Sequence, residues 1–187
     1  MKEPEMIRGY AIPLSAKFLL EDRDVSPAVP VSARTELQRI ASAKPDIWMP
    51  RADAIRLWQM VDDASPDEAA SYHNLTRCGE TIANVAINTF LKLLLRVLSP
   101  KQFANKFPSI WEHEHKGGHV ESSLKDSNHM DIAIRDIEGF RNLGPIARGF
   151  ILTALRAIGL KELEIQDKTW SRATPAPREA ILLASWK

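Results

Sequence analysis

A change of hydrophobic period after Gly117-Gly118 constrains the fold of this chain more than any other feature. Beyond these glycines, Met130 to Ile134 is apolar at every second position, which is the pattern of a half-buried strand. The segment 119–125 should pair with it, because Asp126-Ser127-Asn128 between them has the composition of a turn. The sequence therefore predicts a β-hairpin that follows a helical first half.

A second helix and hairpin are predicted after the first hairpin. Gly144-Pro145 begins a helix that runs to Ile158 and stops at Gly159. Strands follow around Leu163 to Ile165 and over Ala180 to Trp186, with a proline-rich loop, Ser171 to Pro177, between them. The order helices, hairpin, helix, hairpin predicts an α+β fold with N-terminal helices packed on a four-stranded antiparallel sheet.

Two segments with the same pattern, Ser-Pro-x-Glu or Ser-Pro-x-Gln, predict helix starts in the first half of the chain. In Ser65-Pro66-Asp67-Glu68 and Ser99-Pro100-Lys101-Gln102, Ser can cap the helix and Pro occupies the first helical position. Glu or Gln can then reach back to the Ser N–H. The first helix should end near Cys78, and Gly79 should allow a bend into a long helix, Glu80 to Leu98. Pro108 should redirect the helix that begins at Ser99.

The first third of the chain is richer in proline and polar residues than the rest. Glu21 to Pro30 is predicted to be a loop, followed by helices from Ser32 to about Ala43 and from Arg51 to Val61. At 187 residues and 44% hydrophobic composition the chain can bury one sizeable core. We expect a single domain, 1–187, with a helical N-terminal annex at 1–64 and an α+β core at 65–187.

Charge and cysteine content exclude several functional classes. The 25 Lys and Arg residues balance 24 Asp and Glu residues to a net charge of +1, so no nucleic-acid partner is expected. The single Cys78 cannot form an internal disulfide, and no targeting segment opens the chain, which favours a cytoplasmic protein. The longest apolar stretch, Ile82 to Leu98, carries a polar residue every fourth position, so no membrane insertion is expected.

Histidines gather between positions 113 and 129 and raise the question of a metal site. Residues two apart on a helix point in nearly opposite directions, so His113 and His115 converge only in a strand or loop. Gly117-Gly118 leaves His119 without a fixed distance to them. We therefore predict no metal and no cofactor, with His73, His113, His115 and His119 as the alternative ligand set.

A thiol centre is the second chemical alternative, because His73 lies five residues before Cys78. No third group is placed to orient that histidine, and a lone cysteine in a helical apolar context is usually a small core residue. The sequence contains no Gly-x-Ser-x-Gly motif, no P-loop and no Gly-x-Gly-x-x-Gly motif. The prediction is accordingly that the chain is not an enzyme.

Aromatic side chains supply the candidate binding residues. They share an apolar, helical spacing that can line a cavity or fill a core, or they flank the last loop, where aromatic residues favour an interface. The set is Phe90, Phe103, Phe107, Trp111, Phe150, Trp170 and Trp186.

Several strings resemble a protein family best known from myxobacteria. They are Ile7-Arg8-Gly9, Cys78-Gly79, the run Phe107 to Trp111, Arg148-Gly149-Phe150 and the closing Leu183 to Trp186. That family is similar to the superfamily of the haem nitric-oxide-binding domain, the vinyl-reductase four domain and the TRAPP trafficking subunits. The resemblance implies helices over a four-stranded antiparallel sheet, and a role in sensing small ligands or in assembly with partners.

The chain also departs from the patterns of this superfamily. Haem members use an axial histidine on a core helix, for which His73 is the only helical candidate, and a Tyr-x-Ser-x-Arg motif that is absent from this sequence. The vinyl-reductase type carries cysteines around the last hairpin, whereas none follows Cys78 here.

These observations predict a non-enzymatic regulatory or scaffold module that binds a small apolar ligand or a protein partner. Dimerisation through the helical face, giving a homodimer, is a further expectation. The first alternative is a haem- or metal-dependent sensor, and the second is a thiol-dependent enzyme around Cys78.

Overall fold

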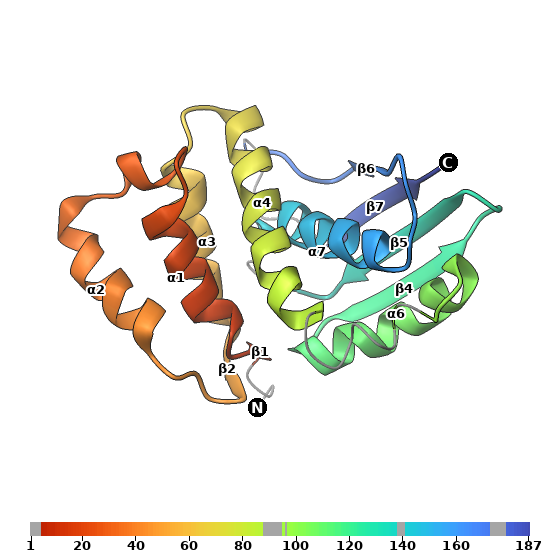
Figure 1. The fold of residues 1–187 in the computed structure, drawn as a ribbon, viewed down its shortest axis with the longest axis horizontal. Coiled ribbons are helices and arrows are strands. Elements are labelled where there is room, and N and C mark those ends of the chain that lie inside the picture. The colour runs from red at the N-terminus through yellow and green to blue at the C-terminus, as the bar shows by residue number, and fades with distance from the viewer. Residues whose placement is uncertain (1–4, 88–94, 96, 138–140, 173–178) are drawn as a thin grey trace.

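The computed structural model describes residues 5–87, 95, 97–137, 141–172 and 179–187. Figure 1 shows a region of helices alone beside a region built around a sheet, with one long helix, α4, between them. The helices are α1 (Ala11–Glu21), η1 (Ser26–Ala28, a 3₁₀ turn), α2 (Val31–Ser42), α3 (Arg51–Asp63), α4 (Glu68–Ala86), α6 (Pro100–Glu114) and α7 (Leu143–Ala157). Buried apolar residues from both regions form one continuous core cluster. The boundary between an annex at 1–64 and a core at 65–187 stays a prediction.

The predicted four-stranded antiparallel sheet is confirmed. Met130, Ile132 and Ile134 are fully buried, as the period-two pattern predicted. Helix α7 packs on the last two strands and α6 packs on the first strand of this sheet, so both helices help to cover it (Figure 1). The strand order is β4-β5-β7-β6, formed by β4 (His119–Leu124), β5 (His129–Arg135), β6 (Glu164–Asp167) and β7 (Glu179–Ser185).

A second, smaller sheet was not predicted. Strand β1 (Met6–Arg8) pairs antiparallel with both β2 (Trp48–Pro50) and β3 (His115–Lys116). Strands of two or three residues are too short to show a hydrophobic period, so the sequence carries no signal for them. This sheet joins the N-terminal segment to the end of α6.

The helices of the first third agree only in part with the prediction. Helices α2 and α3 fall where they were expected, but α1 was not predicted, and it runs to Glu21. The predicted loop that follows is interrupted by η1. The proline-rich loop predicted at Ser171 to Pro177 lies largely outside the described residues.

One of the two predicted capping segments is confirmed and the other is shifted. Ser99 forms a capping box with Gln102 at the start of α6. At the start of α4 the cap is Asp67, whose carboxylate accepts a hydrogen bond from the Ala70 N–H at 2.8 Å. Ser65 instead donates its hydroxyl to the Val61 carbonyl and accepts from Asn74. Ser65 therefore closes the preceding turn and does not start the helix.

The predicted bend at Gly79 is wrong, because α4 continues through it to Ala86. The predicted long helix to Leu98 extends into residues 88–94 and 96, which lie outside the described residues. Of the helices in the described ranges, none combines the length and apolarity needed to cross a bilayer.

Helix α6 is continuous from Pro100 to Glu114 with Pro108 inside it, so Pro108 does not end the helix, and the predicted redirection stays a prediction. Proline cannot donate to the carbonyl four residues earlier, which is that of Ala104. The Ser122 hydroxyl of β4 donates to this carbonyl at 2.5 Å. A side chain from the sheet thus satisfies the acceptor that Pro108 leaves free, and the helix need not break.

Helices α4 and α7 cross with their backbones in contact. A Cβ atom added at Gly149 would lie 2.1 Å from the Thr76 carbonyl oxygen and 2.6 Å from the Glu80 nitrogen. A Cβ added at Gly79 would lie 2.2 Å from the Ile146 carbonyl oxygen. The close approach at Gly149 is thus to the backbone of α4. Both glycines are required by this crossing.

Gly149→Ala is expected to lower the free energy of unfolding by about 3 kcal/mol, because backbone atoms of α4 cannot move aside as a flexible side chain would. Gly159→Ala is the matched control, since a Cβ there meets nothing within 4 Å and only the positive φ of 95° opposes it. That strain should cost about 1 kcal/mol. Urea denaturation of both variants measures the difference, and equal losses would contradict the close crossing.

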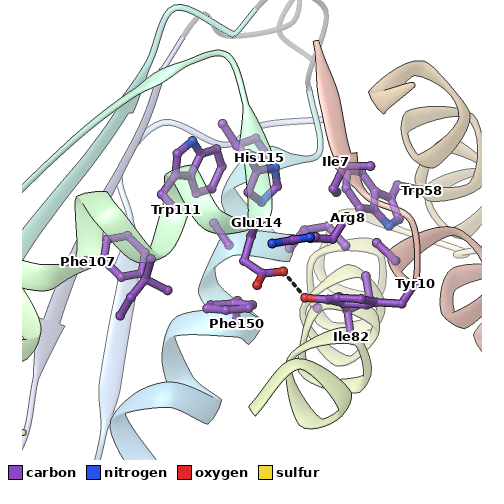
Figure 2. A pocket seen from close by; sticks show the side chains of 16 residues that line it. Ile7, Arg8, Tyr10, Trp58, Ile82, Phe107, Trp111, Glu114, His115 and Phe150 are labelled. Carbon is purple, nitrogen blue, oxygen red and sulfur yellow. Dashed lines mark hydrogen bonds between the residues drawn. The ribbon is translucent and has the colours of Figure 1, made fainter. Parts of the chain in front are cut away.

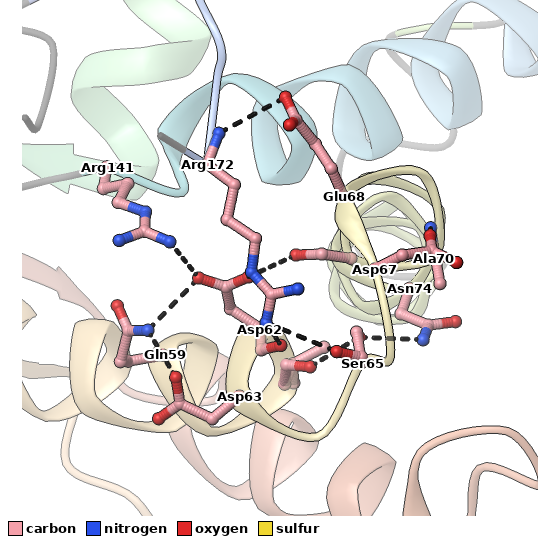
Figure 3. Close-up of polar contacts among 12 residues, drawn as sticks. Gln59, Asp62, Asp63, Ser65, Asp67, Glu68, Ala70, Asn74, Arg141 and Arg172 are labelled. Carbon is pink, nitrogen blue, oxygen red and sulfur yellow. Dashed lines mark hydrogen bonds and ion pairs between the residues drawn. The ribbon is translucent and has the colours of Figure 1, made fainter. Parts of the chain in front are cut away.

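A buried carboxylate ties α3 to the second region. Asp62 is fully buried, and its oxygens contact the Ser71 hydroxyl at 2.5 Å, Arg141 Nη2 at 2.7 Å and Arg172 Nε at 3.0 Å (Figure 3). Arg172 also donates to the Asp62 carbonyl at 2.9 Å. Arg141 lies just before α7 and Arg172 lies before β7, so one carboxylate fixes three segments.

Asp62→Ala should destabilise the protein by about 3 kcal/mol, because it leaves two guanidinium groups without their shared anion. The value lies at the low end for buried pairs, since both arginines are partly exposed to water. Asp63→Ala removes an exposed neighbouring carboxylate and should change stability by less than about 0.5 kcal/mol. Thermal and urea unfolding provide the test, and a similar effect of the two changes would refute the role given to Asp62.

Candidate functional site

A partly enclosed cavity lies where the two regions meet (Figure 2). Its volume, taken as the space open to the centre of a water molecule, is about 40 Å³, which is room for roughly three waters. The lining comes from both regions and is mostly apolar. It consists of Ile7, Arg8, Tyr10, Ala11, Trp58, Gly79, Ile82, Phe107, Ile110, Trp111, Glu114, His115, Leu143, Ile146, Ala147 and Phe150.

Polar groups on one side of the cavity form a connected chain. Arg8 donates through Nε to the His113 carbonyl at 2.7 Å, and its Nη2 lies 2.9 Å from His113 Nε2. His113 Nδ1 lies 2.9 Å from one oxygen of the buried Glu114, and the Tyr10 hydroxyl donates to the other (Figure 2). Burial and the nearby Glu114 carboxylate raise the pKa of Tyr10 far above its ordinary value. Tyr10 thus stays protonated and donates to Glu114 at any physiological pH.

His115 lies beside this chain without joining it. Its imidazole stacks on Trp111, with the ring centres 3.8 Å apart and the planes 11° from parallel. Its Nδ1 is enclosed and has no hydrogen-bond partner in the described part of the chain. Burial, assisted by the charge of Arg51, lowers the pKa of His115 well below its ordinary value. The ring is therefore neutral at pH 7.

Arg51 fixes the strand that carries His115. This guanidinium is 1% exposed and pairs with Glu5 at 2.5 Å. It also donates to the carbonyls of Lys116 and Gly117, each at 3.0 Å. The first residue of α3 thereby holds β3 against β1 and sets the position of the imidazole.

The predicted aromatic residues separate into distinct environments. Phe107, Trp111 and Phe150 line the cavity. Phe103 is fully buried against Phe107, with ring centres 5.6 Å apart, and does not line the cavity. Phe90 lies outside the described residues. Their role in binding stays a prediction.

The two tryptophans near the last loop also differ from each other. Trp186 is buried at 6% exposure, and its role in an interface stays a prediction. Trp170 is half-buried, and its ring packs on Tyr72 at 5.1 Å. Neither residue lines the cavity at the junction of the two regions.

The four histidines of the alternative metal set do not form a metal site. His113 joins the polar chain, His115 lines the cavity, and His119 and His73 are exposed. No group of three or more metal-ligating side chains gathers within the residues that the structure describes.

Cys78 has the environment of a core residue. Its side chain is fully buried, with the sulfur 3.9 Å from the Ser15 hydroxyl oxygen. Burial raises the pKa of the thiol to about 12, so the thiolate that a nucleophilic mechanism requires is scarce at pH 7. His73, its proposed base, is exposed to solvent.

Sequence reasoning missed several residues of the cavity wall. Ile7, Arg8 and Tyr10 lie in a segment to which no element had been assigned, and Glu114 was not among the candidate residues. Trp58 lies in the helix predicted from Arg51 to Val61, but it was not among the candidate residues. The small sheet that brings these residues together could not be predicted.

The sequence and the fold of this chain were compared with those of known proteins. No protein-family model matches the sequence, and no curated protein matches it. Solved structures of H-NOX (haem nitric-oxide-binding) proteins match over nearly the whole chain. An unliganded Fe(II) H-NOX protein from K. algicida superposes with a TM-score of 0.66 at 10% identity, covering 97% of each chain. The Fe(II)NO form of an H-NOX protein from S. oneidensis gives 0.60 at 13% identity, covering 94% of this chain and 99% of the other.

The fold of the chain is therefore the H-NOX fold. This agrees with the fold of the superfamily that the sequence resembles, whereas the myxobacterial family within it is not confirmed. At identities this low the likeness concerns the fold alone, so the site has to be judged from its own residues.

The cavity does not fit a haem group. Pockets for drug-sized ligands measure about 300–1,000 Å³, and a porphyrin belongs to that size class. The space here is about 40 Å³, because Phe107, Trp111, Trp58 and Phe150 occupy the junction with their rings. The sequence has no Tyr-x-Ser-x-Arg motif, and the exposed His73 is not part of the lining.

Proposed function

We propose that this chain is a non-enzymatic sensor module that takes a small, mainly apolar ligand into the cavity between its two regions. The observation that carries the proposal is the cavity itself, which is apolar, partly enclosed and lined from both regions. Cavities with mostly apolar walls can accept small apolar molecules. The H-NOX fold supports a sensor more than a scaffold, because one matched H-NOX protein is described in its Fe(II)NO ligation state.

The position of the cavity supports a regulatory role. Its walls come from β1, α1 and α3 on one side and from α4, α6 and α7 on the other. A ligand there contacts both regions and shifts the balance between their arrangements by its difference in affinity for each. The output would be read by a protein partner or by a second copy of the chain in the cytoplasm.

The second candidate function is a haem-dependent sensor. The similarity to iron-containing H-NOX structures favours it, but the small volume of the cavity argues against it. We expect protein purified from cells grown with ample iron and haem precursor to show no Soret band and no stoichiometric iron. Absorption spectroscopy with metal analysis makes the measurement. A Soret band that survives gel filtration would replace the first candidate with the second.

Xenon provides the direct test of the cavity. Under xenon pressure, amide chemical-shift changes in a ¹H–¹⁵N spectrum should concentrate on lining residues such as Ile82 and Ala147. Ala147→Val should largely abolish them by filling the space, at a stability cost of about 1–3 kcal/mol. Ala133→Val on the sheet, which does not line the cavity, is the matched control and should leave them unchanged. A wild-type spectrum indifferent to xenon would overturn the proposal.

A further inference from the structure

The polar groups in the cavity lining differ in whether the protein satisfies them. Arg8 donates to His113, while Tyr10 and Glu114 hydrogen-bond to each other. His115 makes a ring contact with Trp111, but its enclosed Nδ1 has no hydrogen bond within the described residues. His115 Nδ1 and Trp111 Nε1 are thus the lining groups whose polar capacity is left unused within the described residues, and of the two rings only the imidazole can both donate and accept.

An unused polar group in an apolar wall is costly. A buried donor or acceptor without a partner costs about 1–3 kcal/mol, whereas an apolar side chain of similar size would pack there at no such cost. Native proteins leave few such groups, and those that persist call for an explanation such as an absent water, ion or ligand. The ring is nevertheless held in place, because it stacks on Trp111 and because Arg51 hydrogen-bonds to the strand β3 that carries it.

We infer that His115 is the polar anchor of the cavity, and that the ligand is a small, uncharged, mainly apolar molecule with one hydrogen-bonding group, such as a short alcohol or ketone. The inference rests on the proposed function and gives the chemical class of the ligand. A neutral imidazole offers one N–H donor and one acceptor nitrogen, so it can meet a hydroxyl or a carbonyl in either tautomer.

Charge and volume restrict the ligand further. A charged ligand would lose its hydration in a mostly apolar wall, and both charged lining groups, Arg8 and Glu114, already have partners. The space of about 40 Å³ limits the ligand to a few non-hydrogen atoms unless the wall moves. One hydrogen bond in an apolar site is then the main source of specificity.

A matched pair of probes separates the anchor from the cavity. 2-Propanol and 2-methylpropane have nearly the same shape, and a hydroxyl in one replaces a methyl in the other. Their dissociation constants are measured by NMR titration on the wild-type protein and on His115→Leu. We expect the ratio of 2-propanol to 2-methylpropane affinity to fall about fivefold in His115→Leu, as the loss of one hydrogen bond predicts.

Two further variants provide controls. His115→Gln retains a donor and an acceptor and should restore part of the ratio. His119→Leu removes an exposed histidine outside the lining and should leave the ratio unchanged. In the wild-type protein, 2-propanol should also shift the ring ¹⁵N resonances of His115 more than 2-methylpropane does, which keeps the test available if His115→Leu does not fold.

The outcomes distinguish the anchor from the proposed function. Binding of both probes with an unchanged ratio in His115→Leu, or with equal effects on the His115 ring resonances, overturns the anchor and leaves the cavity as a binding site. Failure of both probes to bind the wild-type protein overturns the proposed function together with the anchor. A reduced ratio with rescue by His115→Gln supports both.

Discussion

The backbone contact between α4 and α7 is the constraint on which the rest of the structure depends. Gly79 and Gly149 each face a carbonyl of the opposite helix at a distance that leaves no room for a Cβ. This contact brings Ile82 of α4 and Ile146 of α7 to the same wall of the cavity. The dimensions of the site are thus set by two residues without side chains, because the separation of the helices fixes how much space the surrounding rings must fill.

The ion pairs made by the buried side chains of Asp62 and Arg51 support the same arrangement of segments as this helix crossing. Asp62 holds α3 to the segments before α7 and β7, and Arg51 holds the other end of α3 to β3. Buried pairs of this kind add little net stability, but breaking one is costly, so they fix an arrangement more than they strengthen it. Because both lie on α3, the helix that supplies Trp58 to the cavity, they also set the orientation of that wall.

Features with a local cause could be predicted from the sequence. The hairpin of β4 and β5 follows from alternation in Met130 to Ile134, and the start of α6 follows from Ser99 and Gln102. The features that local pattern could not show have causes that are distant in sequence. Pro108 fits inside a helix because Ser122 satisfies the carbonyl it leaves free, and Gly79 marks a helix crossing where a bend was expected. A glycine or proline shows that the backbone is special at a position, but its partner decides in what way.

Contacts between segments that are distant in sequence also could not be predicted at the candidate site. Helical spacing placed Phe107 and Trp111 on one face, which is the part of the cavity that local pattern can show. His115 was considered only as a metal ligand, because its pairing with Ile7 of β1 and the nearby charge of Arg51 come from segments far away in sequence. Large rings in the lining leave about 40 Å³ at the junction of the two regions. The volume of the side chains at this junction decides which ligands a protein of this fold can hold. A few lining residues therefore say more about the ligand than the overall similarity to H-NOX structures does.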